Sequence, residues 1–88
     1  EIESFDHETW FVFYHGDMSD HLSVTIDVYD VMGRQVSSIH QETDTVVSVV
    51  PPIHWDGSFL KPGLYVYRFT VTDSKGKTAS MSQRMLKQ

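Results

Sequence analysis

The sequence predicts an all-β domain, an immunoglobulin-like antiparallel β-sandwich of six to seven strands. Three observations predict it. Short runs of β-branched and aromatic residues recur along the chain, clusters of turn residues separate them, and no long segment combines helical apolar spacing with helix caps. The length of 88 residues fits one small domain. We therefore expect two packed sheets and essentially no helix.

The N-terminal residues differ in composition from the rest. Residues 1–8 contain four carboxylates and only two apolar side chains, Ile2 and Phe5. This composition predicts the end of a linker, with the ordered domain spanning residues 9–88. The following run, Thr9–Tyr14, is almost wholly apolar. It predicts a strand that is either covered on both faces or paired as an inner strand.

A strand of clear alternation follows. Its apolar residues Val24, Ile26 and Val28 occupy every second position, which predicts a half-buried strand with Tyr29 on the outward face. The next four residues, 30–33, contain turn-forming Asp and Gly and predict a reversal. The strand 34–40 then closes a β-hairpin.

The middle of the chain is broken more often. Gln41–Asp44 is a polar stretch and predicts a break, and Val46–Val50 predicts a strand. Because Pro51 and Pro52 lack the backbone N–H that a ladder needs, this strand is expected at an edge or to end at its rim. The dipeptides Asp56-Gly57 and Pro62-Gly63 predict the two ends of a loop.

The longest regular strand is expected over residues 65–72 and is predicted to be central. A turn over 73–76 leads into the last strand, with Ala79, Met81 and Met85 on its apolar face and Gln83 interrupting that face. Residues expected to share one core are Val24, Ile26, Val28, Trp55, Tyr65, Tyr67 and Phe69.

Charge and composition exclude several function classes. Lys and Arg number 7 against 12 Asp and Glu, so the net charge of −5 lacks the basic footprint of nucleic-acid binding and disfavours anionic membranes. No apolar stretch approaches the roughly 18 residues of a transmembrane span. The absence of Cys rules out disulfides and thiolate chemistry. Because the chain starts at Glu1 without a Met or a leader-like segment, we interpret it as part of a longer polypeptide.

Residues capable of chemistry are present but not in patterns typical of active sites. His15, Asp17, Asp20 and His21 cluster in one segment, yet their spacing matches no zinc or calcium pattern, so we favour a solvated loop and expect no metal or cofactor. Nothing resembles a nucleophile elbow, so no catalytic residue is assigned and the segment is not expected to be an enzyme. The aromatic residues could offer a sugar-stacking platform, but most are expected in the core.

Three motifs carry a family resemblance. The segment 24–36 contains V-Y-D-x-x-G-R-x-V, residues 55–57 are W-D-G, and residues 63–68 fit G-x-Y-x-Y-R. In this order and at this separation they resemble the C-terminal sorting domains of the bacterial type IX secretion system and the related immunoglobulin-like domain of flagellar hook-capping proteins. The resemblance covers about three quarters of the chain, from residue 24 onward. Within the family, it is most similar to the C-terminal domain of the type IX sortase, the gingipain-maturing surface peptidase.

The resemblance implies a non-catalytic C-terminal targeting and docking module that directs its parent protein through the type IX translocon. Implied partners are the outer-membrane translocon and its shuttle proteins. The implied location is the cell surface, the outer membrane or the secreted fraction, after passage through the periplasm. Whether the domain is cleaved, and its oligomeric state, are left open. The alternative is a structural spacer, or an adhesive, carbohydrate-contacting immunoglobulin-like module, of an extracellular multidomain protein.

The motif residues are expected to serve mainly the fold, since each one has a structural reason of its own in a sandwich of this kind. They are Asp30, Gly33, Arg34, Trp55, Asp56, Gly57, Gly63, Tyr65 and Tyr67.

Overall fold

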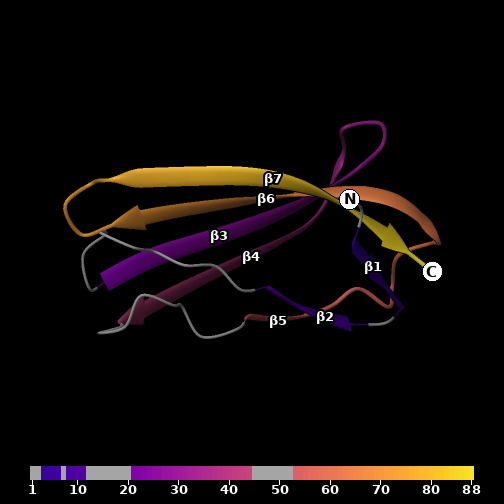
Figure 1. Ribbon diagram of the computed structural model, residues 1–88, viewed down its shortest axis with the longest axis horizontal. Coiled ribbons are helices and arrows are strands. Elements are labelled where there is room, and N and C mark those ends of the chain that lie inside the picture. Colours follow the sequence, from indigo (N-terminus) through magenta and orange to yellow (C-terminus); the bar gives the residue numbers. More distant parts are fainter. Residues whose placement is uncertain (1–2, 7, 12–20, 45–52) are drawn as a thin grey trace.

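The computed structural model describes residues 3–6, 8–11, 21–44 and 53–88, and in them it contains seven strands and no helix. The strands are β1 (Glu3–Phe5), β2 (Glu8–Phe11), β3 (His21–Asp30), β4 (Gln35–Asp44), β5 (Ile53–Asp56), β6 (Gly63–Asp73) and β7 (Thr78–Lys87). They form a five-stranded sheet of order β1-β7-β6-β3-β4 and a two-stranded sheet of β2 and β5 (Figure 1). The predicted all-β, two-sheet architecture is therefore confirmed.

The large sheet is built around β6, which pairs with β3 on one side and β7 on the other, as the prediction of a central strand requires. These pairings and that of β3 with β4 are antiparallel, but β1 runs parallel to β7. In β3 the predicted alternation is confirmed, because Val24, Ile26 and Val28 are no more than 1% exposed. Tyr29, on the other face, is half-buried.

Two hairpins of the large sheet close with the same turn. Asp30 precedes Gly33 and Asp73 precedes Gly76, and in each turn the Gly N–H donates to the Asp carbonyl at 3.0 Å. The Asp Oδ1 accepts from backbone N–H groups two and four residues on, at 2.8 to 3.0 Å. Both glycines have positive φ, 82° and 85°, a conformation that costs other residues energy. The predicted turns at 30–33 and 73–76 are confirmed.

The core lies between the two sheets and is rich in aromatic rings. The ring of Phe11, in β2, lies 4.8 Å from that of Tyr67 and 5.5 Å from that of Phe69, both in β6. All seven residues predicted for the core are buried. The other buried apolar residues are Phe5, Phe11, Leu22, Ile53, Leu60, Val71 and Met85.

The N-terminal residues differ from the linker that their composition predicts. Glu3–Phe5 forms β1, which pairs with Met85–Lys87 at the end of β7. Phe5 is 7% exposed and its carbonyl accepts the backbone N–H of Gln88 at 2.9 Å. One buried aromatic outweighs the acidic composition around it, since a ring of this size contributes a large apolar area. The expected connection to a preceding domain stays a prediction.

The predicted end of the fourth strand was wrong, and one short strand was not predicted. The polar stretch Gln41–Asp44 continues β4 instead of breaking it, because it pairs with the first residues of β3. The predicted loop between Asp56-Gly57 and Pro62-Gly63 is confirmed, and before it lies strand β5, which was not predicted and whose inward residues Ile53 and Trp55 are buried. The expected strand 46–50 and the prolines after it lie outside the described residues.

Strands β2 and β7 also differ from prediction. Described residues of β2 pair only with β5, and Trp10 is 58% exposed, so over this part the strand is not an inner one. In β7, Ala79 and Met81 lie opposite Val71 and Phe69 on the inner face, as expected, but both are exposed and only Met85 is buried. Residues 78–84 of β7 have a described neighbour strand on one side only, so their side chains are covered less.

Candidate functional site

The first motif forms the turn between β3 and β4. Arg34 donates to Asp30 through its backbone N–H at 3.0 Å and through Nε at 2.9 Å. These bonds, the backbone one above all, hold the pKa of the Asp30 carboxyl below its ordinary value despite the opposing effect of burial. The bonds of Asp30 stay within its own turn, and Arg34 is the ion-pair partner that the structure gives it, so the pair closes the hairpin.

The second motif is a packing unit. Trp55 is 5% exposed, and its indole N–H donates to Ser37 Oγ at 3.1 Å, which ties β5 to β4 across the sandwich. Asp56 Oδ1 accepts the backbone N–H of Ser58 at 2.9 Å and shapes the next turn. A Cβ on Gly57 would lie 2.6 Å from the Trp55 ring, so any other residue there would have to displace the ring.

The third motif, residues 63–68, forms the first part of the central strand β6. Gly63 has φ of 151°, the Tyr65 hydroxyl donates to the carbonyl of Lys61 at 2.8 Å, and Tyr67 packs against Phe11. Asp30 lies directly opposite Tyr65 in the sheet, so the first and third motifs are neighbours. The structure thus brings the motifs together at one end of the sandwich, where they build the fold.

A polar cluster covers the outer face of β3 and β4. Glu42 accepts from Ser23 Oγ at 2.7 Å, pairs with His21 Nε2 at 2.9 Å and also contacts His40 Nε2. The Ser23 bond, followed by those of His21 and His40, lowers the pKa of Glu42 to about 2. His40 Nδ1 faces Thr25 Oγ1 at 3.0 Å.

Ser23 does not form a catalytic triad with His40 and Glu42. In a triad the carboxylate and the hydroxyl bond opposite nitrogens of the imidazole. Here Ser23 and Glu42 both face Nε2 of His40, whereas Thr25 Oγ1 faces Nδ1, the nitrogen opposite the one that Glu42 contacts. Of the four residues weighed as metal ligands, only His21 lies in the described part of the chain, and that part holds no group of three His, Cys, Asp or Glu placed to bind a metal.

One open feature of the large sheet is the outer edge of β7. Strand β1 pairs with β7 only from Met85 onward, so within the described residues no strand pairs with Thr78–Arg84 on the side away from β6. Figure 1 shows β7 along the border of the sheet, with β1 meeting it near its C-terminal end. Beside this edge lies a shallow hollow lined by Val66, Ser82, Gln83 and Arg84. We define residues 78–84 as the β7 edge.

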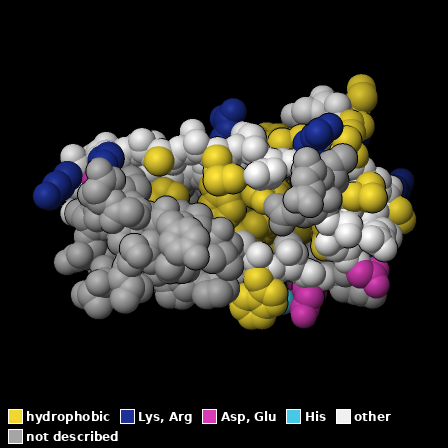
Figure 2. All heavy atoms as spheres, viewed as in Figure 1, with side chains coloured by type: hydrophobic (Ala, Val, Ile, Leu, Met, Phe, Trp, Pro, Cys, Tyr) yellow, Lys and Arg dark blue, Asp and Glu magenta, His cyan; other side chains and the backbone are white. Residues whose placement is uncertain are grey.

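Charge is distributed unevenly between this region and the rest. Residues 63–88 contain five of the seven Lys and Arg but one of the twelve acids, a net charge of +4, whereas residues 1–62 carry −9. In Figure 2 dark blue side chains lie along the upper border and at the end where β6 turns into β7, and magenta ones lie near β2 and β5. Sequence reasoning missed this asymmetry, although a count by segment reveals it.

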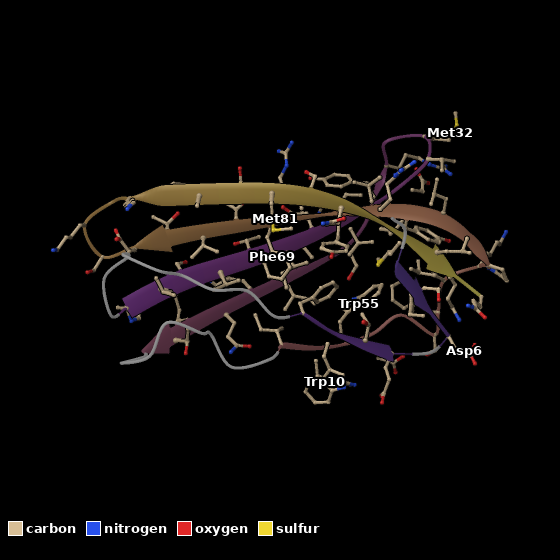
Figure 3. All side chains as sticks on the ribbon, viewed as in Figure 1. Asp6, Trp10, Met32, Trp55, Phe69 and Met81 are labelled. Atoms are coloured by element: carbon tan, nitrogen blue, oxygen red, sulfur yellow. The ribbon has the colours of Figure 1, made fainter. Side chains whose placement is uncertain are left out.

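A second surface feature lies on the outer face of the small sheet. The Trp10 ring lies 4.7 Å from that of His54, and His54 Nε2 pairs with Glu8 Oε2 at 2.8 Å. Figure 3 shows Trp10 directed away from the large sheet and Trp55 within the sandwich. This arrangement presents an aromatic face beside a carboxylate.

Comparison with known proteins gave no match: no family model matches the chain, and neither a curated protein nor a solved structure matches it. In the described residues there is also no helix with the length and hydropathy needed to cross a membrane.

Proposed function

We propose that the chain is a non-catalytic C-terminal targeting and docking module of the type IX secretion kind, with an immunoglobulin-like sandwich fold. The observation that carries the proposal is the three ordered motifs, V-Y-D-x-x-G-R-x-V, W-D-G and G-x-Y-x-Y-R, whose residues meet at one end of the sandwich. Since these residues are used by the fold, a partner is expected to bind surface that the folded domain presents.

The proposed partners are the outer-membrane translocon and its shuttle proteins, and the proposed destination of the parent protein is the cell surface or the medium. Support for protein binding comes from the β7 edge, because a regular strand edge, to which none of the other described strands is paired, is a template for another chain.

The test is an export assay in a type IX-competent bacterium. The 88-residue chain is fused to the C-terminus of a neutral reporter that carries a periplasmic export signal. We expect the reporter on the surface or in the medium with the fusion, and in the periplasm without it. A fused reporter that stays folded in the periplasm would overturn the proposal and favour a spacer.

A carbohydrate-contacting module is the second candidate, and the exposed Trp10 beside His54 and Glu8 favours it. A sugar ring can stack on an indole while its hydroxyls donate to a carboxylate. Trp10→Ala is expected to abolish retention on a bacterial-polysaccharide affinity column. Phe59→Ala, which removes another exposed aromatic ring, is the matched control. Equal retention of both variants would exclude Trp10 as the contact.

A further inference from the structure

We propose that the β7 edge binds an extended segment of the partner protein in which apolar and acidic residues alternate, so that the segment adds a strand to the large sheet. This inference rests on the proposed docking function and names the surface and the chemistry that it would use. The occupant would pair with Thr78–Arg84, which precede Met85, the residue opposite Glu3 at the start of β1.

The backbone N–H and C=O groups of the β7 edge have the regular geometry that pairing with another strand requires. In an antiparallel ladder every second residue directs its N–H and C=O away from its partner strand. The register between β6 and β7 runs from Gly63–Lys87 to Thr72–Thr78 without a bulge. Proteins commonly protect edges with proline, bulges or inward-pointing charges. From Thr78 to Arg84 the strand has no proline, and its inward side chains are uncharged.

The inner side of the edge favours apolar residues of the occupant. Ala79 and Met81 are exposed although they lie on the same face as the buried Val71 and Phe69. Figure 3 shows Met81 beside Phe69, with the two side chains coming from neighbouring strands. An added strand would place every second side chain next to Met81 and remove its apolar surface from water.

The outer side favours acidic residues at the alternate positions. Ser80, Ser82 and Arg84 lie on this face, and Ser82 is directly opposite Arg68 in β6. Both arginines are exposed, and Arg84 lines the shallow hollow beside the edge. Carboxylates of an added strand can reach these guanidinium groups, whereas lysines there would be repelled. The net charge of +4 over residues 63–88 favours the same partner over a basic one.

The opposite edge of the sheet is a poorer template. Among the described strands it belongs to β4, whose pairing with β3 is interrupted by an irregularity at Val28 and Tyr29. Its outer face carries Glu42, already bonded to three side chains, and residues 35–44 contain no Lys or Arg. We therefore expect an acidic segment to bind at the β7 edge and not at β4.

The experiment is an NMR titration of the isotope-labelled 88-residue chain with a blocked peptide of alternating Glu and Val, long enough to span Thr78–Arg84. The matched peptide has Lys in place of Glu. We expect amide shifts confined to the β7 edge and its neighbours with the Glu peptide. Met81→Lys adds an inward charge at a residue that is 45% exposed, and it should weaken binding at least about tenfold with the melting temperature retained.

Two further variants test whether the effect depends on the position of the added charge and on the charge of Arg84. Met32→Lys makes the same change at a turn residue that is 77% exposed and should bind like the parent. Arg84→Glu changes a charge without entering the core and should remove the preference for the Glu peptide. Shifts that map elsewhere, equal binding of the Lys peptide, or full binding by a folded Met81→Lys variant would overturn the inference.

The export assay separates the inference from the proposed function. A domain that exports its reporter but does not bind the Glu peptide overturns this inference and leaves the proposed function standing. A domain that binds the peptide at the β7 edge but exports nothing supports the edge as a binding site and overturns the targeting function alone.

Discussion

The ring of Trp55 lies directly over Gly57, so close that a Cβ on Gly57 would stand 2.6 Å from the ring carbon Cη2. The same Cβ would meet the Phe5 ring at 2.8 Å. Trp and Gly two residues apart therefore form one unit, in which the absence of a side chain makes room for two aromatic rings from different strands. This relationship explains the W-D-G motif physically and ties the first strand to the fifth.

Gly57→Ala is the direct test of that packing. The added methyl must displace two buried rings, and overpacking of this kind costs about 1–3 kcal/mol. In a domain of this size each kcal/mol lowers the melting temperature by roughly 4–8 °C. Thermal unfolding followed by circular dichroism measures the change, with the exposed Ser58→Ala as control. A Gly57→Ala domain as stable as the parent would show that the rings move aside freely.

Phe5→Ala tests whether the N-terminal strand belongs to the domain. Phe5 is buried, its ring lies 5.5 Å from that of Trp55, and Lys87 Nζ lies 5.8 Å from its centroid. Loss of a buried Phe is expected to lower the free energy of unfolding by about 3–5 kcal/mol. Denaturant titration compares this variant with Ser4→Ala, an exposed position in the same strand. Equal denaturation midpoints for the two variants would show that residues 1–8 are a linker and not part of the folded domain.

Gly33→Val tests the turn between β3 and β4. Nothing lies within 4 Å of the Cβ position, so the cost comes from the φ of 82° alone. A residue with a side chain at this positive φ costs roughly 1–2 kcal/mol of stability, and a side chain branched at Cβ raises that cost. Gly33→Asn, which tolerates this conformation, should lose clearly less stability. If Val and Asn are equally tolerated in denaturant titrations, the turn does not depend on positive φ.

Glu42 predicts a pH dependence of stability. Its pKa falls from an ordinary value of 4.5 to about 2 in the folded domain, mainly through the Ser23 bond. A depressed pKa means that this contribution is fully present above about pH 4.5 and is lost as the pH falls toward about 2. In denaturant titrations, the free energy of unfolding should fall less steeply with decreasing pH for Glu42→Gln than for the parent. Asp30, whose pKa is also lowered, should account for part of the pH dependence that remains. Identical slopes would contradict the bonding around Glu42.

Sequence alone predicted the elements whose signals are local. Strand alternation around Ile26 and Phe69 follows the two-residue period of a half-buried strand, and the Asp and Gly residues of the two hairpins determine their turns by backbone chemistry. These features needed no knowledge of distant contacts.

Other features depend on pairings between distant residues. Phe5 is buried only because β7 and Trp55 lie beside it, and no local pattern contains that information. Gln41–Asp44 is polar and still a strand because β3 supplies its hydrogen-bonding partner. The exposure of Met81 follows from the place of β7 in the strand order, so the β7 edge could not be located before the topology was known.

The central claim is that a partner binds the folded domain and thereby directs export. Its most direct measurement is the ratio of surface to periplasmic reporter for three fusions: the parent chain, Trp55→Ala, and a chain lacking residues 77–88. Trp55→Ala leaves the C-terminal strand sequence intact but should cost about 3–5 kcal/mol, enough to unfold much of so small a domain. The account predicts surface reporter with the parent chain and retention in the periplasm with both variants. Surface reporter with both variants would contradict it, because export would then need neither the fold nor the last strand.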